Sequence, residues 1–183
     1  FYLQERVGIN NQKFKLIKFA TMLKNSEEMG SGIYTAKNDS RILPIGNFLR
    51  KTKINELPQI FNILIGDISI VGPRPLIKRT YDLYSLEAKN FIAKMKPGLT
   101  GIGSIIFRNE EELLLKADGD IEDFYKKNIT PHKANLEKWY FNNASLKIDI
   151  LIIFLTVWVI FFKNSKLPSK IFKDLPKFSL ENI

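Results

Sequence analysis

The chain has 183 residues, of which 45% are hydrophobic and 26% charged, a composition typical of one globular domain with a real core. It contains no cysteine and one histidine, which excludes thiolate catalysis, disulfides and cysteine-ligated zinc, and argues against a histidine-based triad or metal site. The formal net charge of +9 favours an acidic partner: nucleic acid, an anionic membrane surface or a phosphorylated substrate. Acid–base chemistry is therefore expected from carboxylates and lysines.

The first 24 residues alternate in part between apolar and basic side chains after a turn at residues 8–11. This pattern predicts a short strand or two at the edge of a small sheet. Lys18 is the residue here best suited to bind a phosphate, although a solvated lysine on a strand is the simpler interpretation. Residues 25–41 are polar, contain two glycines and predict a loop.

Two helices are predicted next. Pro44 favours the start of the first, and Asn55, a preferred N-cap residue, favours the start of the second. The second helix is expected to bury one apolar stripe, formed by Leu57, Ile60, Phe61 and Leu64.

Charged residues gather around the start of that second helix. Glu56 follows the bases Arg50, Lys51 and Lys53, and a short strand at residues 68–71 then leads to Arg74 between two prolines. Prolines on both sides restrict the backbone, so the guanidinium can be directed at a phosphate or carboxylate with little loss of entropy. The run suggests an anion or metal–phosphate site, with a structural ion pair as the alternative for Arg74.

Residues 76–95 predict one amphipathic helix whose inward positions are Leu76, Leu83, Leu86 and Phe91. Residues 96–104 predict a glycine-dense turn that lacks the spacing of a dinucleotide or P-loop motif. Residues 105–107 predict a strand ending at Arg108, and the acidic run 110–112 predicts a solvated helix start. A helix is expected over residues 121–145, with His132 as a surface or capping residue.

The most apolar run, residues 150–162, is shorter than the roughly 20 residues that cross a bilayer. A buried helix, an interfacial membrane helix and a tilted span remain open. Residues 163–183 form a basic tail that suits an anionic headgroup surface, with a disordered tail as the alternative. The chain has no ribonucleoprotein-type aromatic motif and no zinc-finger spacing, so nucleic acid is not expected as a partner.

Several of these motifs occur together in one known family. The run 57–75, preceded by residues 48–51 and followed by residues 96–101, resembles the bacterial sugar transferases, which are monotopic phosphoglycosyl transferases. The most specific elements are Glu-Leu-Pro-Gln at 56–59 and Gly-Asp-x-Ser-x-Val-Gly-Pro-Arg-Pro at 66–75. The resemblance covers about residues 1–155, and the following features also fit it: Gln4-x-Arg6-x-Gly8, residues 14–19 with Met22, and Arg41 before Gly46.

The resemblance implies transfer of a sugar phosphate from a UDP-sugar to undecaprenyl phosphate, a polyprenyl phosphate, with Mg²⁺ and release of UMP. It places this initiating step of surface polysaccharide synthesis at the cytoplasmic face of the bacterial inner membrane. It implies an α+β fold: a compact, mostly helical domain with a small sheet and interfacial membrane helices. We expect this domain at residues 1–162 and the basic tail at 163–183. The family's N-terminal re-entrant membrane helix is missing, so we interpret the sequence as truncated, and a homodimer is left open.

The resemblance also implies an Asp-Glu pair, in which the aspartate attacks phosphorus to form a covalent intermediate and the glutamate holds Mg²⁺. Glu56 matches the glutamate, but Asn55 stands at the position of the nucleophile, and a neutral amide is a poor nucleophile. Ala20 is a second departure, where many members carry Arg or Lys. The predicted substrate contacts are Lys18, Arg74, Gly98, Thr100, Gly101 and Arg108.

Two hypotheses follow from Asn55. In the first, the protein is active through a modified route, by direct attack of the polyprenyl phosphate or with Asp67 as a substitute carboxylate. In the second, it is a catalytically impaired member that binds a nucleotide sugar or partners an active transferase.

Overall fold

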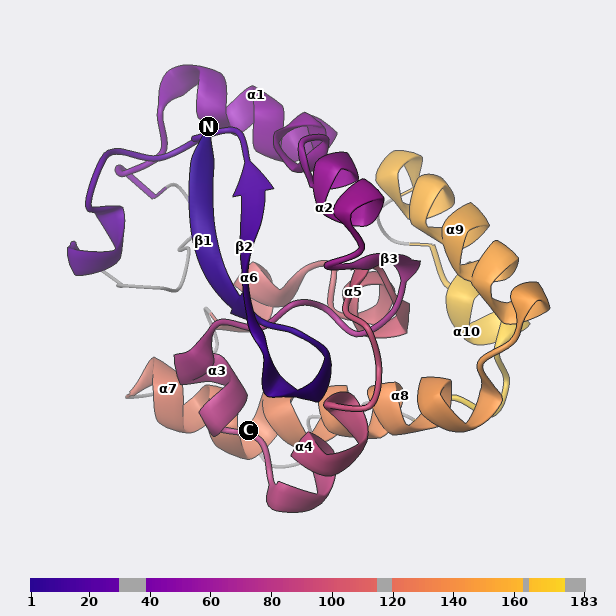
Figure 1. The fold of residues 1–183 in the computed structure, drawn as a ribbon. Helices are drawn as coiled ribbons and strands as arrows, with labels where there is room; N and C mark the ends of the chain where they lie inside the picture. The colour runs from indigo at the N-terminus through magenta and orange to yellow at the C-terminus, as the bar shows by residue number, and fades with distance from the viewer. Residues whose placement is uncertain (30–38, 115–119, 163–164, 177–183) are drawn as a thin grey trace.

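The computed structural model describes residues 1–29, 39–114, 120–162 and 165–176 (Figure 1). Two small sheets lie among many helices. Strands β1 (Tyr2–Val7) and β2 (Lys13–Lys18) pair antiparallel, whereas β3 (Ser69–Val71) and β4 (Gly98–Thr100) pair parallel. The α+β class predicted from the sequence is therefore confirmed.

Helices make up most of the remaining fold, and most of them are short. Those described are α1 (Pro44–Thr52), α2 (Gln59–Ile65), α3 (Lys78–Asp82), α4 (Leu86–Ile92), α5 (Ile102–Ile106), α6 (Glu110–Leu114), α7 (Ile121–Phe124), α8 (Thr130–Asn143), α9 (Leu146–Phe161) and α10 (Leu167–Ile171). Short 3-10 turns cover Ile9–Asn11, Ser26–Glu28 and Ile54–Glu56, and a π-helical turn, Tyr125–Ile129, joins α7 to α8. The helices predicted at Pro44, at the acidic run and over residues 121–145 are confirmed.

The N-terminal hairpin confirms the strand predicted after the turn, as β2, and adds β1 before it. The turn contains Asn10 and Asn11, both with positive φ, a conformation that asparagine tolerates better than most residues. The loop predicted for residues 25–41 lies partly outside the described residues. The described part contains the 3-10 turn Ser26–Glu28.

The glycines of residues 96–104 serve a strand pair. A Cβ atom on Gly98 would stand 2.1 Å from the backbone nitrogen of Gly72, and one on Gly101 would stand 2.2 Å from the carbonyl oxygen of Gly72. Only glycine permits the backbones to approach this closely where β3 and β4 pair. The predicted turn was wrong in part, because residues 98–100 form a strand, β4. The strand predicted at 105–107 was also wrong, because these residues continue or follow α5, which buries Ile102 and Ile105.

The single helix predicted over residues 76–95 was wrong as well. The chain breaks after α3, and Ser85 begins α4 by accepting a hydrogen bond from the backbone nitrogen of Ala88 at 3.2 Å. This new helix start rotates the following residues, so Leu86, expected inside, is exposed.

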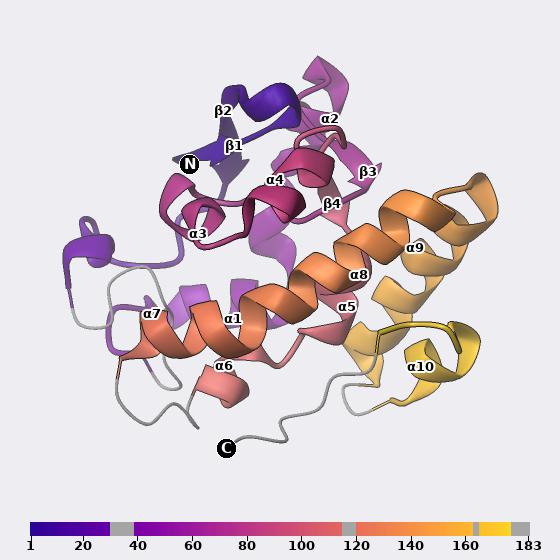
Figure 2. The ribbon, with the colours of Figure 1, turned by 90° about the horizontal axis from the view of Figure 1, so that it is seen from below.

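The core lies where α8, α9 and α5 meet, and Figure 2 shows α8 running across the molecule with α4 on one side and α5 on the other. Phe172, which follows α10, is buried and contacts Trp139 of α8 edge-on. Part of the region predicted as a basic tail thus packs on the core, while the domain boundary at residue 162 stays a prediction. The fully buried apolar side chains include Ile102, Ile129, Leu136, Ile152 and Leu155.

The apolar stripe predicted for the helix after Asn55 lies on the opposite side from the one expected. Leu57, Ile60, Phe61 and Leu64 are all exposed, Leu64 to 77%. The buried positions of this segment are instead Asn55, Pro58, Gln59 and Asn62. Helical spacing shows which residues share a face, but it does not show which face meets the core.

Helix α9 contains most of the apolar run 150–162. This helix lies along the right of Figure 1. It buries Ile152, Leu155 and Val159, and it exposes Ile153, Phe154 and other apolar side chains. Among the described residues, no helix combines the length and apolar character needed to cross a membrane.

Candidate functional site

The candidate site is built on the segment that joins α1 to α2. The backbone nitrogen of Phe19, just after β2, donates to the carbonyl oxygen of Asn55 at 3.0 Å. Deeper along α2, the Asn62 side chain accepts from the backbone nitrogen of Ile17 at 3.0 Å and donates to the carbonyl oxygen of Lys15 at 2.8 Å. These hydrogen bonds hold the end of β2 against α2, so Lys18 lies beside Asn55 and Glu56.

Glu56 is a largely buried carboxylate surrounded by cations. Its Oε1 atom lies 3.8 Å from the Lys53 ammonium and 3.8 Å from the Arg74 guanidinium. Burial alone would raise the pKa of Glu56, but the charges of Arg74, Lys53, Lys18 and Arg50 outweigh burial and hold that pKa below its ordinary value. Glu56 is therefore ionised at neutral pH.

Lys18 lies in the same cluster of cations, but there burial and the neighbouring positive charges disfavour its charged form. Burial, followed by the charges of Arg6 and Arg74, lowers the pKa of Lys18 to about 7, although Glu56 opposes the shift. A lysine crowded by other cations is stabilised in its charged form when an anion binds among them. The arrangement therefore favours a phosphorylated ligand.

A small cleft brings several of these groups together. It is lined by Arg6, Leu16, Lys18, Gln59, Arg74, Pro75, Gly98 and Leu99. Arg6 Nη1 donates to the carbonyl oxygen of Pro75 at 2.9 Å, which links β1 to the segment that carries Arg74. Of the predicted substrate contacts, the structure thus places Lys18, Arg74 and Gly98 at one cleft.

Arg108 lies near the same cluster. The pKa of Lys53 is lowered first by burial and then, against the attraction of Glu56, by the charges of Arg74 and Arg108. Burial also lowers the pKa of Arg108 itself. Arg108 therefore adds to the positive potential around Glu56.

Thr100 and Gly101, also predicted as substrate contacts, have structural neighbours. The hydroxyl oxygens of Thr100 and Thr156 lie 2.6 Å apart, which ties β4 to α9, and Gly101 packs against Gly72. Neither residue lines the cleft. Their contacts with a nucleotide stay predictions.

Asn55 does not act as the predicted N-cap. The 3-10 turn is preceded by Lys53 in a left-handed conformation, α2 is preceded by Pro58, and neither helix start has a side-chain hydrogen bond. Asn55 is 8% exposed, and its Oδ1 atom is buried with no hydrogen-bond partner among the described residues. An unpaired buried carbonyl oxygen is costly, and it marks a position that a donor or a cation could occupy.

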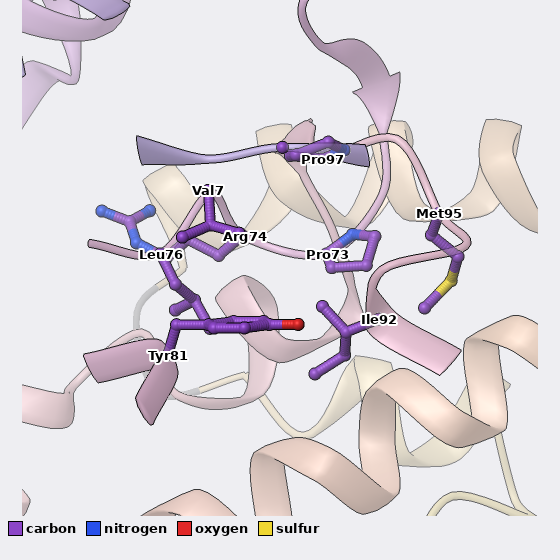
Figure 3. Close-up of a pocket in the computed structure, with 9 residues that line it drawn as sticks. Val7, Pro73, Arg74, Leu76, Tyr81, Ile92, Met95 and Pro97 are labelled. Atoms are coloured by element: carbon purple, nitrogen blue, oxygen red, sulfur yellow. The ribbon is translucent and has the colours of Figure 1, made fainter. Parts of the chain in front are cut away.

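A second pocket contains mainly apolar side chains, and Figure 3 shows the Arg74 guanidinium at one end, away from Ile92 and Met95. The Tyr81 hydroxyl points across it and donates to Asn11 Oδ1 at 2.6 Å. The side chains around this pocket pack the proline-bounded segment against α3 and the hairpin turn, so they help to fix the position of Arg74.

The resemblance implies Mg²⁺ as the cofactor, and the oxygen atoms around Glu56 are the candidates to hold it. The described residues contain no group of three or more His, Cys, Asp or Glu side chains that could hold a metal ion. Mg²⁺ is commonly held by one or two carboxylates together with substrate phosphates and water. Glu56, with the unpaired Asn55 Oδ1 atom, fits an ion that arrives with phosphates, and the surrounding cations oppose binding of the free ion.

Sequence reasoning missed Arg6 and Gln59 as cleft residues, although both lie in motifs that it had identified. Arg6 belongs to Gln4-x-Arg6-x-Gly8, and Gln59 ends Glu-Leu-Pro-Gln. Gln59 is the first residue of α2 and, with Asn62, one of two polar residues in an otherwise apolar helix, which was the available signal.

Comparison with known proteins gives a consistent result. The family model described as bacterial sugar transferase matches residues 1–163. The chain is 34% identical over 173 residues to a UDP-galactose-lipid carrier transferase of Erwinia amylovora, covering 87% of this chain and 32% of that protein. It is 34% identical over 169 residues to a UDP-glucose:undecaprenyl-phosphate glucose-1-phosphate transferase of Klebsiella pneumoniae, covering 90% of this chain and 33% of that protein.

A shorter relative is matched over more of its length. The exopolysaccharide production protein ExoY of Sinorhizobium fredii is 32% identical over 171 residues, which cover 86% of this chain and 68% of that protein. The chain thus spans about a third of the length of the two longer relatives. The match over residues 1–163 shows that the chain belongs to the bacterial sugar transferase family.

Proposed function

We propose that the protein transfers a sugar phosphate from a UDP-sugar to undecaprenyl phosphate, releases UMP and so initiates synthesis of a surface polysaccharide. The observation that carries this proposal is the ionised Glu56 within a ring of cations beside a cleft lined by Lys18 and Arg74. Relatives named for this chemistry, including the Klebsiella pneumoniae protein, support it.

The chemistry requires such a cluster. The diphosphate of the UDP-sugar and the phosphate of the lipid repel each other, and the transition state carries further charge on the phosphoryl oxygens. Lys18, Arg74 and Arg108 would neutralise this charge and orient the diphosphate. Glu56, with the Asn55 carbonyl oxygen, would hold Mg²⁺, which supplies Lewis-acid stabilisation of the phosphoryl oxygens.

Asn55 requires a route without an aspartyl intermediate. A phosphate oxygen of undecaprenyl phosphate attacks the sugar-bearing phosphorus of the UDP-sugar, and the bond from that phosphorus to the UMP oxygen breaks. The electron pair leaves with UMP, so the products are undecaprenyl diphosphosugar and UMP. Asp67 is a poor substitute nucleophile, because it follows the far end of α2 and accepts a hydrogen bond from Asn62 at 2.9 Å.

The lipid substrate calls for a membrane, and we place the protein on the cytoplasmic face of the bacterial inner membrane, in a monotopic arrangement. Helices α1, α2 and α9 lie along the upper and right edges of Figure 1. Their exposed side chains would insert among lipid headgroups and acyl chains as interfacial helices. These side chains are Ile45, Phe48, Leu57, Ile60, Phe61, Leu64, Ile65, Ile150, Ile153, Phe154, Val157 and Phe161.

A second candidate function rests on the same Asn55. If the neutral amide abolishes turnover, the cation cluster would still bind a nucleotide sugar, and the protein would act as a binding partner of an active transferase.

One assay separates the two candidates. The full chain, in lipid nanodiscs with Mg²⁺, undecaprenyl phosphate and a panel of UDP-sugars, is expected to release UMP only when the lipid acceptor is present. Release from no donor by the parent, together with release by Asn55→Asp, would favour the impaired member. Absence of release from both would contradict the transferase function.

A further inference from the structure

Three carboxamide side chains lie on the buried side of the segment that contains α2. The backbone stays right-handed helical through Leu57 and Pro58, so the 3-10 turn leads into α2 without a change of hand. Asn55, Gln59 and Asn62 are spaced four and three residues apart, and they consequently share one face. All three are buried.

Asn62 shows how a structural carboxamide is used in this fold. Its oxygen accepts from Ile17, and its nitrogen donates to the carbonyl oxygen of Lys15 and to the carboxylate of Asp67. Both ends of the amide are satisfied within the protein. Burial of this side chain therefore stabilises the packing of α2 against β2.

Gln59 is buried as deeply, with 3% of its surface exposed, but the structure records no hydrogen bond from its side chain to the described residues. Gln59 lines the cleft together with Lys18 and Arg74. The Gln59 amide is not among the fully buried polar atoms that lack a partner, so it is open to the cleft rather than enclosed in the core. A phosphorylated ligand in the cleft would accept the hydrogen bond that the side-chain nitrogen does not make within the described part of the protein.

We propose that Gln59 is a substrate-binding residue whose side-chain nitrogen donates a hydrogen bond to a phosphoryl oxygen of the diphosphate held by Lys18 and Arg74. This inference rests on the proposed function, since it assigns the donor diphosphate to the cleft. The cations supply charge, and the amide supplies direction, because its position at the base of the cleft is set by α2. A side chain already immobilised by burial loses little entropy when the ligand arrives.

The experiment measures binding of two probes by calorimetry in the presence of Mg²⁺. UDP and inorganic pyrophosphate are titrated into the full chain and into Gln59→Met, Gln59→Glu and the control Lys138→Ala. Met retains the length of Gln without its hydrogen-bonding groups, and Glu adds a negative charge at constant shape. Lys138 pairs with Glu87 on the exposed side of α8 and serves as a surface change outside the cleft.

Gln59→Met is expected to weaken both probes about tenfold or more, the effect of one hydrogen bond to a charged group. Gln59→Glu should weaken both further, and Lys138→Ala should bind as the parent does. Thermal melting of Gln59→Met should match the parent, since no internal hydrogen bond is lost. Parent-like binding by Gln59→Met would overturn the proposal, and so would a loss confined to UDP, which would place the contact on the uridine. A lower melting temperature at unchanged affinity would assign Gln59 to structure alone.

Failure of this inference is distinguishable from failure of the proposed function. If Gln59→Met binds the probes as the parent does and still releases UMP, the transferase function is supported and only the role of Gln59 is wrong. If binding of the probes depends on Gln59 but no UMP is released, the contact is supported and the transferase function is contradicted. A parent that binds neither probe would overturn both.

Discussion

The guanidinium of Arg74 and the carboxylate of Glu56 lie 3.8 Å apart, between Nη2 and Oε1, although they are separated by α2 and β3 in the chain. Arg74 remains partly exposed, while Glu56 is largely buried. Arg74 also lines the cleft, and its charge is the largest of those that hold the pKa of Glu56 below its ordinary value. Under the proposed function, Arg74 would contact both the carboxylate assigned to Mg²⁺ and the substrate phosphates.

Arg74→Ala is therefore expected to reduce UMP release by about a hundredfold or more, the usual cost of removing a donor that stabilises developing charge. Arg74→Lys should recover part of the rate, because it restores the charge without the planar fork. Initial rates at saturating UDP-sugar measure the effect, with Lys138→Ala as the control for lost surface charge. Equal rates for parent and Arg74→Ala would remove Arg74 from the site.

Asn55 leads to a kinetic prediction. A direct displacement gives no UMP without acceptor, and it gives no exchange of labelled UMP into UDP-sugar. Asn55→Asp is expected to acquire this exchange, since its carboxylate can attack the sugar-bearing phosphorus and release UMP before the acceptor binds.

The exchange assay uses radiolabelled UMP, a UDP-sugar and Mg²⁺, with undecaprenyl phosphate omitted. Glu56→Gln combined with Asn55→Asp is the control, because it keeps the new carboxylate and removes the one that we propose holds Mg²⁺. Exchange by the parent would show that another side chain forms a covalent intermediate, and the direct route would then be wrong.

The sequence predicted the family and the cation cluster because these depend on contiguous motifs. Glu56, Arg74 and the bases before Glu56 lie within one run, and the helix starts at Pro44 and in the acidic run follow from local preferences. The proximity of Lys18 to Glu56 could not be read locally, since it depends on Asn62 joining α2 to β2 across 45 positions of the chain. The same tertiary contact explains why the apolar stripe faces outward.

Glycine-rich residues 96–104 show another limit of predicting structure from the sequence alone. A turn and a tightly packed parallel strand both require glycine, and only the position of Gly72 in space distinguishes them. Gly98 and Gly101 were therefore identified as special from sequence, while the reason for them came from the pairing of β3 with β4.

Asn62→Leu is expected to destabilise the fold by about 3 kcal/mol or more, because it leaves the backbone groups of Ile17 and Lys15 without partners in a buried place. Urea unfolding measures the change. Gln59→Met on the same face should alter the unfolding free energy by under about 1 kcal/mol, since it breaks no internal hydrogen bond. Equal losses for the two variants would contradict the distinction between the structural amide and the ligand-binding amide.

The exposed side of α2 leads to a membrane prediction. Leu64→Ser is expected to weaken binding to phosphatidylethanolamine–phosphatidylglycerol vesicles by about tenfold, in line with roughly 1.5–3 kcal/mol for burial of a leucine side chain. Leu86→Ser is the matched control, because Leu86 is as exposed but lies on α4, at the lower side of Figure 1. Vesicle flotation measures both. Equal effects at the two positions would separate α2 from the membrane-binding surface.

A buried carboxyl group far from the cleft predicts how stability depends on pH. Glu137 of α8 is 5% exposed, and its Oε2 atom has no hydrogen-bond partner among the described residues. Burial raises the pKa of Glu137 to about 8, although the nearby Lys133 opposes the shift. Lys133 itself pairs with Glu110 at 2.7 Å and donates to the Tyr125 hydroxyl, so its charge is directed elsewhere.

The folded-state pKa of Glu137 is thus above its ordinary value of 4.5. The folded protein holds the proton more tightly than the unfolded chain, so this contribution to stability is complete below the ordinary pKa and is lost as the pH rises towards 8. The loss between pH 5 and 8 amounts to at most about 4 kcal/mol. Glu137→Gln keeps the shape and removes the titration, so its unfolding free energy should vary less over this range.

Urea unfolding of the parent and Glu137→Gln at pH 5, 6.5 and 8 measures the difference. The other groups near Glu137, including Lys133 and Tyr84, are present in both proteins, so the difference between the two curves isolates the contribution of Glu137. The variant should gain stability relative to the parent as the pH rises, with the largest gain at pH 8. Parallel curves would mean that the Glu137 carboxyl group finds a partner or water in solution and keeps an ordinary pKa.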